Sequence, residues 1–341
     1  MTITEERVHK GWLAGLPMLF ALSQGCAAGP EMGSVTDHAD LAPFIQEMVD
    51  RHGFDANQLT ELFANARMRP DIIEAISRPA EAKPWYQYRR IFLTPGRIDG
   101  GIVYWNRHQK ILAAARERYG IDPRVIVAII GVETSYGRND GSYRVLDSLS
   151  TLAFGYPPRA QFFRGELEQF LLLSQEEQVD PLTVTGSYAG AMGQGQFIPS
   201  SYRRYAVDFD EDGKRDLWGS PSDIIGSVAN YLHKHGWEPR QVVVSPVRVH
   251  GNRYRTLLGQ GLKPHTSLAK MRQYGVEPLA SLPNQRLGML VELETRKGSE
   301  YWLGLNNFYV ITRYNHSALY AMAVHQLSEE IEKQREIVNN L

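Results

Sequence analysis

The chain has 341 residues, which is enough for two or three domains with a well-buried core. Hydrophobic residues make up 43% of it, charged residues make up 22%, and the formal net charge is −1. This balance excludes the basic surplus of a nucleic-acid-binding protein and the acidic surplus of a disordered one. The single cysteine, Cys26, excludes an internal disulfide and a cysteine-based metal cluster.

Residues 1–28 predict a signal segment for export to the bacterial periplasm. A small basic patch precedes an apolar run from Trp12 to Leu22, and small residues follow. The run is too short to span a bilayer and is typical of a secretory signal. Cleavage after "CAA" would remove Cys26. The alternative is lipidation of Cys26 at the outer membrane, although Ser23 stands where the lipoprotein pattern has Leu. A third interpretation is an ordinary N-terminal helix.

Residues 39–120 predict a helical region. "DLAPFIQEMVDRH" opens with Asp40 as a candidate N-cap, and two shorter helices follow over "DANQLTELFANA" and "RPDIIEAIS". The prolines in "RPAEAKPWYQYRRIF" indicate an extended or irregular segment. "GGIVYWNRHQKILAAARERYG" predicts one long helix that ends at Gly120.

The clearest helix lies in "IDPRVIVAIIGVETSYG", with Asp122 as N-cap and Pro123 at the first helical position. Further helices are expected in "RAQFFRGELEQFLLLSQEE", in part of "IPSSYRRYAVDF" and in "SDIIGSVANYLHKHG". Short β-rich runs such as "QVVVSPVRV", "GMLVELET" and "NFYVITRY" then predict a small antiparallel module. A helix returns with "SALYAMAVHQLSEEIEKQREIV".

Glu133 continues an apolar stripe on the helix that begins after Asp122. Ile126, Ile129 and Glu133 are spaced three and four residues apart and therefore share one face. A carboxyl group on such a face loses hydration, which raises its pKa, and a protonated glutamic acid can donate a proton to a leaving group. The competing interpretation is a glutamate at a helix end that reaches solvent.

"GSYAGAMGQGQFIPSSY" (186–202) is rich in Gly, Ser and Gln and poor in charge. Such a segment allows close approach of the backbone to a ligand and offers neutral hydrogen-bonding groups that suit sugars. It lacks the Lys-Ser/Thr ending of a phosphate-binding loop, which excludes nucleotide binding of that type.

Five motifs in order resemble the lytic murein transglycosylase B family, whose members have a goose-type lysozyme-like core. They are "GVETSYGR", "LSTLAFGYPPRAQFFRGELEQFL", "GSYAGAMGQGQFIPSSY", "DFDEDGKRDLW" and "IGSVANYL", within residues 85–320. The resemblance implies that Glu133 is the single catalytic acid and base. It also implies a set of substrate-binding residues: Tyr88, Arg159, Ser187, Gln196, Phe197, Tyr231, Tyr314, Asn315 and Tyr320. Pro158 replaces the first of two arginines that bind the peptide or muramyl part in the family.

The implied reaction is non-hydrolytic cleavage of the bond between N-acetylmuramic acid and N-acetylglucosamine, which gives a 1,6-anhydro product. Most glycosidases use two carboxylates. Here Glu166 and Glu168 lie on a helix with a surface pattern, and Asp140 and Asp147 lie in or near a loop, so none matches the setting of Glu133. A hydrolytic lysozyme and a non-catalytic peptidoglycan-binding scaffold remain alternatives. The expected partners are peptidoglycan glycan strands, and cell-wall synthesis or division proteins stay open as others.

"DFDEDGKRDLWGSPSD" predicts a calcium loop. Asp208, Asp210 and Asp212 occupy positions 1, 3 and 5 of an EF-hand pattern, Gly213 occupies position 6, and Lys214 offers its carbonyl at position 7. Position 12 is Gly219 instead of Glu, and the resemblance points to Asp223 as the last ligand. We expect a structural Ca²⁺ and no cofactor for catalysis; a bare turn is the alternative.

The predicted fold is mainly α (α+β), a lysozyme-like helical core with an N-terminal helical region and a small antiparallel β module. After the signal segment, the expected domains are a helical domain (39–110, completed by 320–341), a catalytic core with the calcium loop (111–238 and 309–320), and a β domain (239–308).

Overall fold

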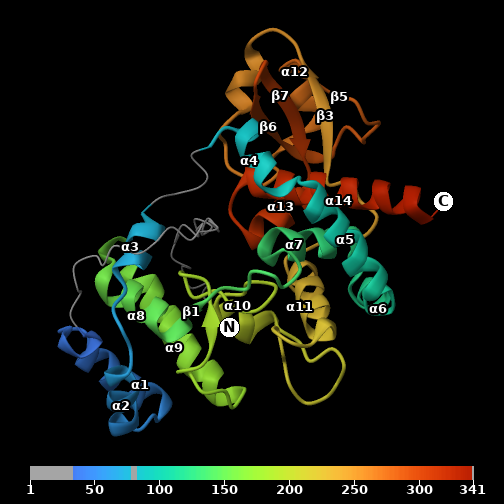
Figure 1. Cartoon of the computed structure of the whole chain (residues 1–341). Coiled ribbons are helices and arrows are strands. Elements are labelled where there is room, and N and C mark those ends of the chain that lie inside the picture. The colour runs from blue at the N-terminus through green and yellow to red at the C-terminus, as the bar shows by residue number, and fades with distance from the viewer. Residues whose placement is uncertain (1–33, 78–82, 340–341) are drawn as a thin grey trace, which may run out of the picture.

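The computed structural model describes residues 34–77 and 83–339 of the chain. The predicted signal segment, with Cys26, lies outside the described residues. Helices dominate, and a five-stranded antiparallel sheet forms a module at one end of the molecule (Figure 1), which confirms the α+β class. Among the helices that the structure describes, none combines the length and the apolar character that a membrane span requires.

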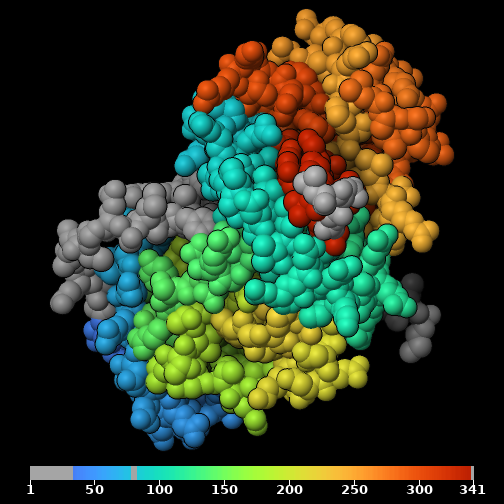
Figure 2. Space-filling model, turned by 45° about the vertical axis from the view of Figure 1, so that its right-hand side comes forward, coloured from blue at the N-terminus to red at the C-terminus, as the bar shows by residue number. Residues whose placement is uncertain are grey.

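The N-terminal helices lie at the opposite end of the molecule from the sheet (Figures 1 and 2). They follow a 3₁₀ turn, η1 (Val35–Asp37), and comprise α1 (Leu41–His52), α2 (Ala56–Ala64) and α3 (Pro70–Ile76). The turn and α3 pack against α8 (Val145–Gly155) of the core. The predicted N-cap Asp40 does precede α1, but its side chain makes no capping hydrogen bond and instead pairs with Arg164 on α9 (Ala160–Glu176).

The next three helices differ from the sequence-based expectation. They are α4 (Trp85–Phe92), α5 (Pro95–Arg107) and α6 (Gln109–Tyr119). The described part of the segment expected to be irregular forms α4, because Trp85, Tyr88 and Phe92 share one face and bury it. The single long helix expected over 100–120 is two helices, since the backbone of His108 leaves the helical region at φ −109° and ψ 23°.

The core surrounds α7 (Pro123–Thr134), whose residues are almost all buried. Its other elements are helices and one small hairpin: α8 (Val145–Gly155), η3 (Pro157–Arg159), α9 (Ala160–Glu176), α10 (Pro199–Tyr205), α11 (Pro221–Lys234), α13 (Asn306–Tyr314), α14 (Ala318–Asn339), β1 (Tyr143–Arg144) and β2 (Thr185–Gly186). Helix α14 packs against α7, α5 and α4, and α8 packs against α9.

The β module has the strand order β4-β6-β7-β3-β5, and every neighbouring pair is antiparallel. Its elements are β3 (Val244–Val249), η4 (Arg253–Leu257), β4 (Thr266–Ser267), α12 (Leu268–Gln273), β5 (Val276–Pro278), β6 (Leu287–Thr295) and β7 (Gly298–Gly304). The prediction of a strand over "NFYVITRY" is wrong, because this segment is α13. Its β-branched and aromatic residues are buried against the helical core, and such tertiary burial overrides strand propensity.

One hydrophobic core extends from Val35 to Ile331 through both the N-terminal helices and the helices around α7. The β module adds a second, smaller cluster that includes Leu268, Met271 and Leu303. The proposed domain boundaries therefore stay a prediction, since α3 packs on α8 whereas α4 and α5 pack on α14.

Candidate active site

Helix α7 carries Glu133 to the floor of a cleft. The Asp122 side chain accepts a hydrogen bond from the backbone of Arg124, and Pro123 occupies the first turn, so both predicted start signals are confirmed. Glu133 lies in the last turn and only 6% of its surface is exposed. The helix ends at Thr134, and its C-cap Ser135 has a left-handed backbone conformation with a φ of 51°.

The carboxyl group of Glu133 is held in its protonated form by its surroundings. Burial disfavours the charged form and raises the pKa of Glu133 to about 8, while a hydrogen bond from the Tyr320 hydroxyl acts in the opposite direction. Tyr320 comes from α14 and is itself buried. The predicted apolar stripe therefore has the expected effect on the pKa of Glu133, and the role of this residue as a proton donor stays a prediction.

Glu133 opens into a cleft of about 310 Å³. Most of the predicted substrate-binding residues line this cleft together with Glu133: Arg159, Ser187, Gln196, Phe197, Tyr231, Tyr314 and Asn315. They come from segments that are far apart in sequence: η3, the loop before α10, α11, and α13 with the residue after it. Sequence reasoning predicted this gathering through the resemblance, and the binding role of each residue stays a prediction.

Aromatic rings form one wall of the cleft. The centroids of Tyr231 and Tyr314 are 4.8 Å apart, and Phe197 lies 5.7 Å from the first and 5.8 Å from the second. The hydroxyl of Tyr314 donates to the carbonyl oxygen of Gly195 at 2.6 Å, and that of Tyr231 donates to the carbonyl oxygen of Arg313. The rings are fixed by these bonds and offer apolar faces of the kind that pack against sugars.

The Gly-rich loop places two polar residues in the cleft. Ser187 Oγ accepts a hydrogen bond from the backbone of Ala191 at 3.0 Å, which holds the loop closed on itself. Gln196 donates through Nε2 to the carbonyl oxygens of Gly193 (2.8 Å) and Asp140 (2.9 Å). Its φ of 51° is a left-handed conformation, which non-glycine residues adopt at a cost and often at functional sites.

Arg159 and Glu166 lie at another part of the cleft. The guanidinium of Arg159 sits over the rings of Phe162 at 4.4 Å and Phe163 at 5.2 Å. The expectation that Glu166 lies on a surface pattern is wrong, because this carboxylate is 6% exposed and lines the cleft. Its oxygens accept from the backbone and the hydroxyl of Ser200 at 2.9 and 2.7 Å. The burial of Glu166 was hard to predict, because α9 buries more of its circumference than the charges in its sequence indicate.

Two predicted binding residues, Tyr88 and Tyr320, do not line the cleft, and Tyr320 instead lies beneath it, hydrogen-bonded to Glu133. Tyr88 is 4% exposed and packs between Trp85 and Phe92 on α4, with ring centroids 6.4 and 5.2 Å away. A sugar-stacking role for Tyr88 stays a prediction. Conversely, His235 lines the cleft and stacks on Tyr231 at 4.1 Å, and only the "HG" turn after α11 could have pointed to it.

The acidic loop places three carboxylates together. Asp208, Asp210 and Asp212 each offer an oxygen, and these atoms lie within 4.8 Å of one another. Oxygen ligands of this kind fit a hard divalent cation such as Ca²⁺. The positive φ of Gly213, 91°, supplies the sharp turn that the EF-hand pattern requires at this position.

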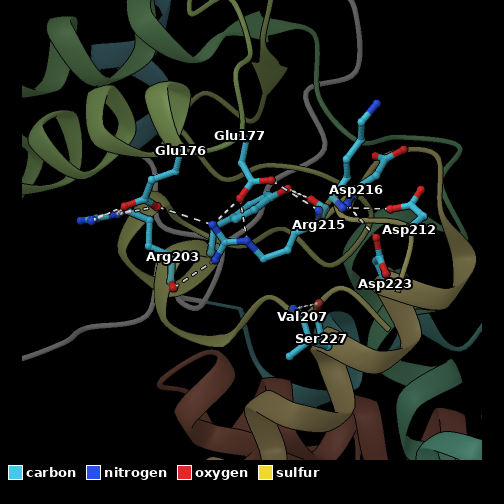
Figure 3. Close-up of polar contacts among 11 residues, drawn as sticks. Glu176, Glu177, Arg203, Val207, Asp212, Arg215, Asp216, Asp223 and Ser227 are labelled. Carbon is cyan, nitrogen blue, oxygen red and sulfur yellow. Dashed lines mark hydrogen bonds and ion pairs between the residues drawn. The ribbon is translucent and has the colours of Figure 1, made fainter. Parts of the chain in front are cut away.

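Asp223 braces the same loop from α11. It is fully buried, and its two oxygens accept from the backbone of Phe209 at 2.7 Å and of Asp216 at 2.8 Å. Figure 3 shows this contact beside an ion-pair network in which Arg203 binds Glu176 and Arg215 binds Glu177. The structure thus confirms that Asp223 lies next to the loop. Metal ligation by Asp223, and by Lys214 through its carbonyl, stays a prediction.

Comparison with known proteins gives a consistent family. The model of the transglycosylase SLT domain matches residues 36–329. The chain is 44% identical over 309 residues to membrane-bound lytic murein transglycosylase B of Escherichia coli, which covers 88% of this chain and 84% of that protein.

Solved structures are similar over the same span. Soluble lytic transglycosylase SltB1 of Pseudomonas aeruginosa has 51% identity and a TM-score of 0.82, covering 86% of this chain and 99% of that one. The Escherichia coli enzyme Slt35 in complex with calcium has 43% identity and a TM-score of 0.82, covering 89% and 96%. SltB3 of Pseudomonas aeruginosa in complex with NAG-anhNAM-pentapeptide has 34% identity and a TM-score of 0.76, covering 88% and 80%. The chain belongs to the family of SLT-domain lytic transglycosylases.

Proposed function

We propose that this protein cleaves the β-1,4 bond between N-acetylmuramic acid and N-acetylglucosamine in peptidoglycan and forms a 1,6-anhydro product without water. The observation that carries the proposal is the setting of Glu133, a buried carboxylic acid with a pKa of about 8 at the floor of an aromatic-walled cleft. The related SltB3 complex contains an anhydro sugar, the type of product that this reaction would give.

One carboxyl group would serve first as acid and then as base. Protonated Glu133 gives its proton to the glycosidic oxygen, and the bond from that oxygen to C1 of the muramic acid breaks. The positive charge that develops at C1 is relieved by the N-acetyl group of the same sugar. The Glu133 carboxylate then takes the proton of the C6 hydroxyl, and O6 closes onto C1. Glu133 regains its proton, so the cycle needs no water.

The hydrogen bond from Tyr320 supports both halves of this cycle. The phenolic hydroxyl donates to Glu133, so it stabilises the carboxylate that exists after the first proton transfer. Burial alone would hold the proton too strongly for Glu133 to release it at neutral pH. The combination of a buried site and one donor leaves the pKa near 8, close enough to neutrality for transfer in both directions.

Glu166 is a poor candidate for the second carboxylate of a hydrolytic mechanism, although it lines the same cleft. Both of its oxygens already accept hydrogen bonds from Ser200. A general base that activates water needs an oxygen directed at that water. This difference favours a single acid and base over the two-carboxylate hydrolysis of a lysozyme.

Muropeptide analysis tests the proposal. Purified sacculi are digested with the protein, and the soluble products are weighed by mass spectrometry. We expect terminal anhydro sugars, which are lighter than hydrolysed ends by one water. Products with hydrolysed ends would contradict the proposal and indicate a lysozyme. The absence of any soluble product would indicate a non-catalytic scaffold for cell-wall synthesis or division proteins.

We also propose that the acidic loop holds a structural Ca²⁺ through Asp208, Asp210 and Asp212, with the Lys214 carbonyl and Asp223 completing the site. The calcium complex of Slt35 supports this assignment. Bound calcium would offset the mutual repulsion of the carboxylates and take no part in the chemistry. At a free concentration of 100 times Kd, a ligand that binds only the folded state stabilises it by ~2.7 kcal/mol.

Thermal unfolding with calcium and with a chelator tests the loop. We expect Tm to rise by several degrees with calcium in the wild type, and the rise to disappear in Asp210→Asn, which removes one charge from the cluster. Glu294→Gln, an exposed change in the β module, serves as the matched control and keeps the rise. An unchanged Tm in the wild type would contradict the calcium site.

The place of action that we propose is the periplasm, which peptidoglycan strands occupy. The signal-like residues 1–28 and the envelope location named for the Escherichia coli relative support it. Attachment to the outer membrane through Cys26 is the alternative. Labelling with a palmitate analogue, compared between the wild type and Cys26→Ser, separates these outcomes, because only the lipidated protein incorporates the label at that residue.

A further inference from the structure

The tripeptide Gly193–Gln194–Gly195 lies between the acidic loop and the turn that follows Glu133. Both glycines permit a close approach that a side chain would block. A Cβ on Gly193 would lie 2.5 Å from the carbonyl oxygen of Leu217, and one on Gly195 would lie 3.1 Å from the Tyr314 hydroxyl. The segment is therefore built for contact on both sides, and Gln194 stands at its centre.

Toward the acidic loop, Gln194 makes two hydrogen bonds. Its backbone N–H donates to the carbonyl oxygen of Leu217 at 2.8 Å, and its side-chain Nε2 donates to the carbonyl oxygen of Trp218 at 3.0 Å. The backbone of Trp218 in turn donates to Asp216 Oδ1 at 2.8 Å, and the backbone of Asp216 donates to the buried carboxylate of Asp223 (Figure 3).

Toward the active site, Gln194 holds the residue that follows Glu133. The Thr134 hydroxyl donates to the carbonyl oxygen of Gln194 at 3.0 Å and accepts from the backbone of Gly137, also at 3.0 Å. Thr134 is fully buried. The Gln194 side chain also rests on Gly137, where an added Cβ would lie 2.7 Å from its Cδ. The turn after Glu133 thus rests directly on this glutamine.

We propose that Gln194 is a positioning residue that fixes the end of the Glu133 helix against the acidic loop. Its backbone N–H and side-chain amide hold the acidic loop, and its backbone carbonyl holds Thr134. A change in the side chain therefore frees Trp218 directly and loosens the turn through the lost anchoring of residue 194 and its contact with Gly137. The turn needs such support because Ser135 and Tyr136 both have left-handed backbone conformations, with φ of 51° and 64°. The proposal rests on the assignment of Glu133 as the catalytic acid.

A misplaced helix end changes the chemistry more than it changes substrate binding. In the aromatic wall, Tyr231 is held by the carbonyl oxygen of Arg313 and Tyr314 by that of Gly195, and neither bond uses the Gln194 side chain. Glu133, in contrast, immediately precedes Thr134. A displacement on the order of 1 Å of a catalytic group can reduce the rate by about a hundredfold. We therefore expect the effect in kcat and little effect in KM.

The test measures the rate at which Gln194→Met releases soluble fragments from peptidoglycan, whatever the nature of their ends. Methionine keeps the length of the side chain and removes the amide. We expect kcat to fall about tenfold, KM to change less than twofold and Tm to stay within a few degrees, by analogy with the cost of a misplaced catalytic group. Gln241→Met, an exposed change in the β module, is the matched control and keeps wild-type values.

A second pair of variants acts from the other side of the same link. Thr134→Val removes the hydroxyl that reaches Gln194, and Thr134→Ser keeps it. We expect Thr134→Val to lose activity as Gln194→Met does, Thr134→Ser to restore most of it, and the double variant Gln194→Met/Thr134→Val to be no worse than the more severe single variant. Residues that act through one link show such non-additive losses. This pair also decides the question if Gln194→Met does not fold.

The pH dependence of kcat adds a readout that a purely structural role would not move. A loosened helix end admits water to Glu133, which lowers its pKa and moves the alkaline limb to lower pH. The other titratable groups that face Glu133 are the hydroxyls of Tyr231, Tyr314 and Tyr320, and burial raises the pKa of all three.

Unchanged kcat in Gln194→Met, or additive losses in the double variant, would overturn the proposal. Because fragment release is counted regardless of product type, hydrolysed ends would contradict the proposed reaction alone.

Discussion

Two glutamates in one cleft, Glu133 and Glu166, have equal burial and different surroundings. Each is 6% exposed, and burial is the main cause that raises the pKa of each. Glu166 accepts two hydrogen bonds from Ser200 and lies near the cation of Arg159. Glu133 accepts a hydrogen bond from the uncharged hydroxyl of Tyr320.

The comparison teaches that burial alone does not make a catalytic acid. A buried carboxylate whose oxygens are satisfied by donors is a structural brace, since the donors stabilise its charged form and occupy its lone pairs. At Glu166 the brace holds the start of α10, directly after the loop that contains Gln196 and Phe197. At Glu133 burial outweighs the hydrogen bond from Tyr320, and this balance favours the protonated form. Four predictions sharpen this contrast.

The largest expected effect is the loss of turnover in Glu133→Gln. The amide keeps the shape and cannot give or take the proton, and general acid–base catalysis is worth about 10²–10⁴ in rate. We expect at least a thousandfold loss, with folding and glycan binding retained. Glu166→Gln is the matched control in the same cleft, and we expect it to keep the reaction within about tenfold. Comparable losses in the two variants would contradict the different roles.

The second prediction is that Glu133 lowers the stability of the folded protein as pH rises. The folded state holds the Glu133 proton up to about pH 8, whereas the unfolded chain releases it near 4.5. The unfolded state therefore binds fewer protons between these values, and the free energy of unfolding of the wild type falls as pH rises through this window. Glu133→Gln lacks this loss.

We therefore expect Glu133→Gln to be more stable than the wild type at pH 8, by an amount on the order of a few kcal/mol. The difference should vanish at pH 4 and grow steadily between pH 4.5 and 8. Denaturant unfolding at four or five pH values measures it. A difference that does not depend on pH would mean that Glu133 titrates normally and would remove the basis for its role as an acid.

The third prediction is a loss of stability in Glu166→Gln. One oxygen of the amide can still accept from Ser200, but the NH₂ group replaces the second acceptor and leaves a buried donor unsatisfied. Such a change costs about 1–3 kcal/mol. Ser200→Ala removes only the hydroxyl bond and should cost less, about 1 kcal/mol. Denaturant unfolding measures both, and a Glu166→Gln variant as stable as the wild type would show that the brace is not needed.

The sequence predicted those parts of the site that local signals and motifs specify. The cap at Asp122, the proline at position 123 and the apolar stripe specify α7 and its buried Glu133 from local sequence alone. The acidic loop follows from the spacing of its aspartates. The resemblance supplied the residues of α11 and α13, because no local pattern connects Tyr231 with Tyr314.

The failures share a physical cause, which is burial by distant segments. Glu166 was predicted to lie on the surface and the α13 segment to form a strand, because the neighbours that bury them are far away in the sequence. The positioning role that we propose for Gln194 could not be predicted for the same reason. Its partners Thr134 and Trp218 are 60 and 24 residues away, and its hydrogen bonds with them need the folded chain.

The smallest expected effect, and the most direct test of the contrast between the glutamates, is a shift of the pH–rate profile in Tyr320→Phe. The hydroxyl of Tyr320 stabilises the charged form of Glu133. Its removal therefore increases the difference from Glu166, whose charged form is stabilised by Ser200. The pKa of Glu133 then rises, and the alkaline limb of kcat/KM moves to higher pH. A single hydrogen bond to a charged group is worth about 1.5–3 kcal/mol, which corresponds to a shift of roughly 1–2 pH units. At pH 7 the acid form already predominates in both proteins, but a carboxylic acid with a higher pKa is a weaker proton donor to the glycosidic oxygen. We therefore expect a modest fall in kcat at neutral pH together with the shifted limb.

Tyr301→Phe, in the β module, is the control for loss of a phenolic hydroxyl away from the cleft. If the limb of Tyr320→Phe stays where it is in the wild type, Tyr320 supports Glu133 through packing alone, and the balance between burial and hydrogen bonding must be set by other groups.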